Sequence, residues 1–139
     1  MNHHKKHILF LIITLIACNM ETKTINKIEE LLNYKFKQDV EETYYEVWKP
    51  NEELAYSYTI GKIKISREQY ELLVHYLETE NNFEHPKFKL NWKIPDEFDA
   101  DWWNPKLESS PNTIYNSFEN GWIQIKHENE YVYILQTIN

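Results

Sequence analysis

The chain has 139 residues, a formal net charge of −7 and 15% aromatic residues, with two glycines and one cysteine. The acidic charge argues against a nucleic-acid partner, which would need a basic face, and two separated glycines exclude the glycine-rich phosphate loops of common nucleotide-binding motifs. The length suits one domain with its own hydrophobic core, and a single cysteine leaves that core without an internal disulfide.

The chain starts with a basic segment that contains Lys5 and Lys6, followed by an apolar run from Ile8 to Ile16. This run is shorter than the ~20 residues that a membrane-spanning helix needs. The small residue Ala17 then precedes Cys18, the chain's one cysteine. The order resembles the signal peptide of a bacterial lipoprotein, with Leu15-Ile16-Ala17-Cys18 as its lipobox. The alternative is a plain secretory signal in which the cysteine is incidental.

The resemblance implies cleavage between Ala17 and Cys18 and attachment of acyl chains to Cys18, which removes the thiol from any redox or nucleophilic role. Several chains anchor a protein stably, since each buried methylene contributes about 0.8 kcal/mol. Residues 1–17 are then the cleaved signal peptide, residues 18–23 a lipidated tether and residues 24–139 one globular domain. Because the signal peptide holds Lys5 and Lys6 and no acid, its loss changes the net charge from −7 to −9. Asn19 favours the outer membrane in a cell with two membranes, with the domain on the periplasmic or cell-surface face.

Residues 24 to 65 predict a helix and then a hairpin. Near-helical apolar spacing predicts a helix from Thr24 to Lys37, with Glu29 and Glu30 turned away from the core. Thr43 to Trp48 and Leu54 to Ile65 are rich in β-forming residues and flank a Lys49-Pro50-Asn51-Glu52 turn. In the second strand the apolar positions change from even to odd at Gly61, which predicts a bulge or sharp bend there.

The second half of the chain predicts a helix, an irregular segment and a hairpin. Ser66-Arg67-Glu68-Gln69 fits a capping box, and the following apolar stripe predicts a helix that ends near Asn81-Asn82. Phe83 to Asn112 holds four of the five prolines and three of the five tryptophans, which is typical of irregular structure. Trp122 to Lys126 and Tyr131 to Gln136 alternate as strands around a His127-Glu128-Asn129-Glu130 turn. Together the elements predict a single-domain α+β fold, a small antiparallel sheet of two hairpins packed against two helices.

The segment from Asp96 to Asn104 concentrates acids and indoles and contains the candidate ligand-binding residues. Asp96, Asp99 and Asp101 lack the spacing and the glycine of a calcium loop, so we predict no metal. Trp102 and Trp103 form a candidate sugar site, with indoles stacked on a pyranose and Asp99 and Asp101 bound to its hydroxyls. The alternative, which the sequence favours, is a tryptophan pair packed under a long loop with the aspartates in turns.

No other motif supports catalysis. His75, expected to face solvent, His85 and His127 lack the spacing of zinc ligands, and Ser109-Ser110-Pro111 lacks the glycines of a nucleophile elbow. Paired carboxylates can hydrolyse glycosides, but the sequence does not give their separation in space. We therefore expect neither a catalytic site nor a cofactor.

These observations leave three functional hypotheses. The leading one is a membrane-anchored, non-enzymatic protein-interaction domain of the accessory, inhibitor or immunity type, because tyrosine and tryptophan anchor binding surfaces and an acidic domain suits a basic partner. The second is a carbohydrate-binding or glycan-processing surface lipoprotein that uses Trp102 and Trp103. The third is a structural lipoprotein of the envelope.

Overall fold

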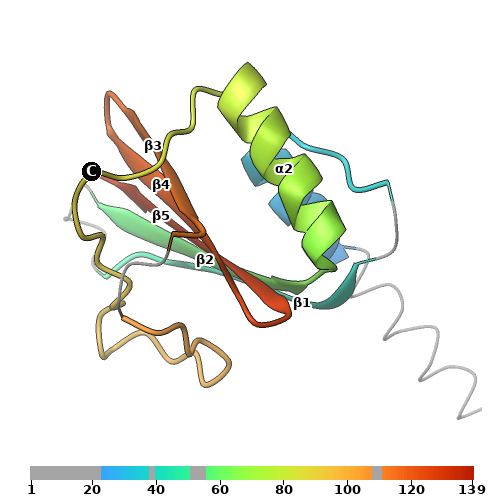
Figure 1. Ribbon diagram of the computed structural model, residues 1–139. Helices are drawn as coiled ribbons and strands as arrows, with labels where there is room; N and C mark the ends of the chain where they lie inside the picture. Colours follow the sequence, from blue (N-terminus) through green and yellow to red (C-terminus); the bar gives the residue numbers. More distant parts are fainter. Residues whose placement is uncertain (1–22, 38–39, 51–55, 108–110) are drawn as a thin grey trace, which may run out of the picture.

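The structure is a computed structural model that describes residues 23–37, 40–50, 56–107 and 111–139. Two helical segments, residues 23–32 and α2 (Arg67–Glu80), pack on one face of a five-stranded antiparallel sheet (Figure 1). The prediction of an α+β fold with an antiparallel sheet is confirmed. The strands in the spatial order of the sheet are β1 (Glu41–Trp48), β2 (Ser57–Lys64), β5 (Tyr131–Ile138), β4 (Gly121–Glu128) and β3 (Thr113–Phe118).

The sheet contains a strand that the sequence analysis did not assign. β3 follows the proline-rich segment and pairs with β4 from Thr113↔Lys126 to Phe118↔Gly121. The C-terminal hairpin of β4 and β5 is longer than predicted, and its turn shrinks to two residues, Asn129 and Glu130. His127 was predicted to lie in this turn, but it lies in β4 because the pairing continues to Glu128↔Tyr131.

The prediction of a bulge at Gly61 is wrong. β2 pairs with β5 without interruption from Ser57↔Ile138 to Lys64↔Tyr131. The apolar positions change parity because β2 is buried on both faces: Ile60 packs under a long loop and Ile63 packs under the helices. Both residues are fully buried, so each face of the strand needs its own apolar positions.

The first helix is shorter than predicted, and one of its acids is buried. Helical structure ends at residue 32, and Asn33 has a left-handed φ of 49°. Glu29 was predicted to turn away from the core, but it is 9% exposed. Its carboxylate accepts a hydrogen bond from the Phe36 backbone N–H at 3.0 Å and pairs with the Lys35 ammonium. Glu29 is buried because it satisfies the polar groups of the segment that follows the helix.

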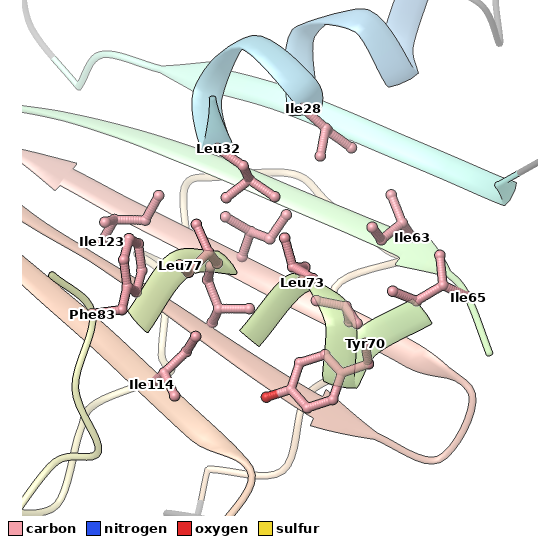
Figure 2. Close-up of a cluster of buried hydrophobic side chains, with 13 residues drawn as sticks. Ile28, Leu32, Ile63, Ile65, Tyr70, Leu73, Leu77, Phe83, Ile114 and Ile123 are labelled. Carbon is pink, nitrogen blue, oxygen red and sulfur yellow. The ribbon is translucent and has the colours of Figure 1, made fainter. Parts of the chain in front are cut away.

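The second helix begins and ends as the sequence predicts. Ser66 Oγ accepts from the Gln69 backbone N–H at 3.2 Å, and Gln69 Oε1 accepts from the Ser66 backbone N–H at 2.8 Å. Asn81 is the C-cap residue. The helix packs its apolar side onto the sheet beside Ile28 and Leu32 of the first helix, through the side chains of Tyr70, Leu73 and Leu77 (Figure 2).

Residues 88 to 107 form a long loop that covers the opposite face of the sheet, after Glu84 has bridged to Tyr115 at the edge strand β3. This segment and the loop-facing sides of the strands form a second buried cluster that contains Ile60, Trp92, Phe98, Tyr133 and Leu135. The molecule therefore has three layers, with the helices and the loop on opposite sides of the sheet (Figure 1). Within the residues that the structure describes, no helix is both long and apolar enough to cross a membrane.

Candidate functional site

Trp102 and Trp103 lie in the layer formed by the loop, and both are half-buried. Trp103 Nε1 donates to the Trp92 carbonyl at 3.3 Å, and its ring meets Tyr133 edge-on with 5.5 Å between centroids. Trp102 stacks on Tyr44 with 5.2 Å between centroids and an angle of 18° between the rings. The pair thus attaches the loop to the sheet, and each indole keeps part of its surface exposed.

The acids near the two tryptophans are exposed. Asp96 pairs with Lys93 at 3.3 Å, and Asp99 and Asp101 lie at the surface. No group of three or more histidine, cysteine or acidic residues gathers at one point within the described ranges. The lipobox residues, Cys18 among them, and the serine pair at 109 and 110 lie outside those ranges.

Two of the three candidate histidines, His75 and His85, line one shallow hollow beside α2, and His127 lies in β4. His75 is exposed on α2, as expected, and His85 Nε2 lies 3.2 Å from Glu78. His127 stacks on Tyr70 with 4.6 Å between centroids. Burial, together with the positive charge of Arg67, lowers the pKa of His127 from its usual value.

Lys62 and Lys126 are buried on the loop-facing side of the sheet, where they hold the loop. Lys62 is 7% exposed, and its ammonium donates to the Trp102 carbonyl and to Asn104 Oδ1, both at 3.1 Å. The same ammonium lies 4.2 Å from the centroid of the Tyr131 ring. Burial lowers the pKa of Lys62, and the charge of Glu42 opposes this shift.

Lys126 is 2% exposed, donates to the Lys106 carbonyl and pairs with Glu128 at 3.1 Å. Tyr133, between the two lysines in the sheet register, donates its hydroxyl to Asn104 Oδ1 at 2.8 Å. Burial, and then the charge of Glu128, raises the pKa of Tyr133 to about 12. This polar network is satisfied internally, so we assign it to attachment of the loop and not to catalysis.

A groove of about 530 Å³ lies beside the loop on the same face of the sheet. Tyr58, Thr137, Trp122 and Ser117 stand in register across β2, β5, β4 and β3 and form its floor. The loop residues from Phe88 to Asn91, with Lys93, form its wall. The volume is within the range of roughly 300–1,000 Å³ that small-ligand sites occupy.

The groove exposes large aromatic side chains. Phe88 is 56% exposed and Trp122 is 37% exposed. Phe88 meets Tyr115 edge-on with 5.3 Å between ring centroids, and Gln124 Nε2 donates to the Asn91 carbonyl beneath the wall. The sequence analysis assigned Trp122 to a strand and missed this site, because its residues come from four strands and a distant loop.

A search of protein families, curated proteins and solved structures found no match to this chain. The function must therefore be inferred from the groove and from the N-terminal segment.

Proposed function

We propose that the chain is a membrane-anchored lipoprotein whose folded domain is a non-enzymatic protein-interaction module of the accessory, inhibitor or immunity type. The observation that carries this proposal is the groove, in which Phe88 and Trp122 are exposed beside a floor supplied by three further strands. Aromatic side chains in a pocket contribute a large share of the binding energy at protein interfaces.

The chemistry of the lining favours binding over catalysis. Among the described residues, those that line the groove supply aromatic rings, ammonium groups, amides and hydroxyls, and none supplies a carboxylate, an imidazole or a thiol. General acid–base catalysis needs a group that exchanges protons near neutral pH.

The lipobox at Leu15 to Cys18 supports attachment to a membrane by acyl chains on Cys18. In a cell with two membranes we propose the outer membrane, with the domain on the periplasmic or cell-surface face. The acidic domain gains little attraction to anionic lipid, so the acyl chains hold it there.

Photocrosslinking in cells tests the interaction. A benzophenone amino acid in place of Phe88 should give one discrete adduct with a partner protein, because Phe88 forms the wall of the groove. The matched control carries the same group in place of Leu72, which is 50% exposed on α2, in the helix layer. Trp122→Ser should weaken the adduct from position 88. Equal adducts from both positions, or none from position 88 in membrane-localised protein, would contradict the proposal.

Carbohydrate binding is the second candidate function, because Trp102 and Trp103 retain exposed surface next to Asp99 and Asp101. A glycan array probed with the detergent-solubilised lipoprotein tests it. Loss of the signal in Trp102→Ala and its retention in Trp122→Ala would locate sugar binding at the loop tryptophans.

A further inference from the structure

The middle of the groove floor holds a buried hydroxyl. Thr137 lies between Tyr58 on β2 and Trp122 on β4, and opposed residues of antiparallel strands have Cβ atoms about 5 Å apart. The threonine is 3% exposed, and its Oγ1 has no hydrogen-bond partner among the described residues. The small threonine side chain stands between two larger aromatic side chains, Tyr58 and Trp122, in the floor of the groove.

The wall of the groove contains two ammonium groups among its hydrogen-bonding groups. The two oxygens of Asn91 are occupied, since its carbonyl accepts from Gln124 Nε2 and its Oδ1 accepts from the Lys93 backbone N–H at 3.0 Å. The ammonium groups of Lys89 and Lys93 are donors and offer no acceptor. A ligand that supplies acceptor oxygens complements this lining.

The charge of the groove is opposite to that of the whole molecule. Its lining includes Lys89 and Lys93 and no acidic residue, on a chain of net charge −7. Two carboxylates outside the lining contact groove residues. Asp96 pairs with Lys93 at 3.3 Å, with both side chains largely exposed, and Glu84 accepts from the Tyr115 hydroxyl at 2.6 Å. Lys89 has no such pair among the ion pairs of the described residues, so the lysines still outnumber the acid beside them. The groove therefore favours a carboxylate over a cationic group.

From these features we infer that the groove binds a peptide segment of the partner protein in which an aromatic side chain lies next to a carboxylate. The ring packs between Trp122 and Tyr58, and the carboxylate meets Lys89 and Lys93. This inference rests on the proposed interaction function and specifies the chemistry of the partner.

Three probes that share one ring and differ in charge test the inference: N-acetylphenylalanine, N-acetylphenylalaninamide and phenylalaninamide. Each is titrated into the detergent-solubilised full chain, and the indole N–H signal of Trp122, assigned with Trp122→Phe, is followed by NMR. We expect N-acetylphenylalanine to bind roughly fivefold more tightly than the neutral N-acetylphenylalaninamide, and the cationic phenylalaninamide to bind most weakly. A difference of this size is what ion pairs between the probe carboxylate and two exposed lysines can supply.

Charge variants identify the groups that recognise the carboxylate. In the double variant Lys89→Gln and Lys93→Gln, the affinities of the carboxylate probe and the amide probe should differ by no more than about twofold. The affinity of the amide probe itself should stay unchanged. Lys23→Gln with Lys37→Gln removes the same charge from exposed residues outside the groove and should leave the difference unchanged.

The outcomes separate this inference from the proposed function. Equal binding of the three probes, or no shift of Trp122 with any of them, would overturn the preference for a carboxylate, and an adduct from position 88 would still support a protein partner. Tighter binding of glucuronic acid than of N-acetylphenylalanine would overturn the peptide assignment and identify a saccharide site. The probes could bind in the expected order while no adduct forms from position 88. That result would contradict the interaction function and would still support the preference of the groove for a carboxylate.

Discussion

Lys62 and Lys126 lie in the interior, where an ammonium group needs partners that replace water. Each finds them in the loop: Lys62 donates to the Trp102 carbonyl and Lys126 to the Lys106 carbonyl. The loop has no helix or strand to satisfy its own carbonyls, so buried lysines perform that role.

Lys62→Met should lower the free energy of unfolding by about 2 kcal/mol, because the Trp102 carbonyl and Asn104 lose a buried charged donor while the volume is kept. The control is Lys64→Met on the same strand and face. Lys64 makes three ion pairs with carboxylates that are largely exposed, so its loss should cost clearly less than the loss of Lys62. Urea unfolding measures both, and equal losses would contradict the attachment role of Lys62.

The stability of the domain should fall below neutral pH, partly through His127. Its lowered pKa means that the unfolded chain takes up a proton near pH 6.5, before the folded state does, so stability is lost as pH falls below about 6.5. His127→Phe keeps a ring against Tyr70 and should show a smaller loss between pH 7 and pH 5. The control variant is His75→Gln, at an exposed position, and it should lose as much stability between pH 7 and pH 5 as the wild type. Chemical denaturation across this pH range gives the comparison.

At the scale of elements, the two glycines have different roles. A Cβ added at Gly121 would overlap the Thr137 carbonyl oxygen on β5. A Cβ at Gly61 would lie 3.6 Å from Ile134 and 3.7 Å from Ile28, which are ordinary contacts. The space at Gly61 therefore accommodates a methyl group, whereas Gly121 allows β4 to begin against β5.

Gly121→Ala should destabilise the domain by about 2 kcal/mol or more, because the added methyl forces β4 away from its partner strand. Gly61→Ala should change stability by less than about 1 kcal/mol, since its methyl fits beside Ile134. Thermal unfolding of both variants checks the difference, and a larger loss at Gly61 would show that the helix cannot adjust.

Local sequence signals predicted the elements whose causes are local. The capping box at Ser66 and Gln69 placed the start of α2, and alternation placed the hairpin of β4 and β5. β3 escaped prediction because its residues follow a proline-rich segment, and only pairing with β4 makes them a strand. The burial of Glu29 depends on the chain turn after residue 32, which helical periodicity does not contain.

For the whole molecule, the first prediction concerns the anchor. Cys18→Ser should move the protein from the membrane fraction to the soluble fraction and abolish labelling with palmitate, because no other feature of the sequence supplies acyl attachment. Trp122→Ala, which alters the groove and leaves the lipobox intact, should stay in the membrane fraction and keep its label. Membrane association of the Cys18→Ser protein would contradict the lipoprotein hypothesis.

The sequence by itself determined the α+β class with an antiparallel sheet, the capped helix α2 and the C-terminal hairpin, because capping, alternation and turn residues act over a few neighbouring positions. It also supplied the lipobox, which stays a prediction. The tertiary structure alone decided that β2 is buried on both faces, that Lys62 and Lys126 hold the loop, and that Trp122 and Phe88 line one groove. These features join residues far apart in the chain, so they follow from strand order and register and leave no local pattern.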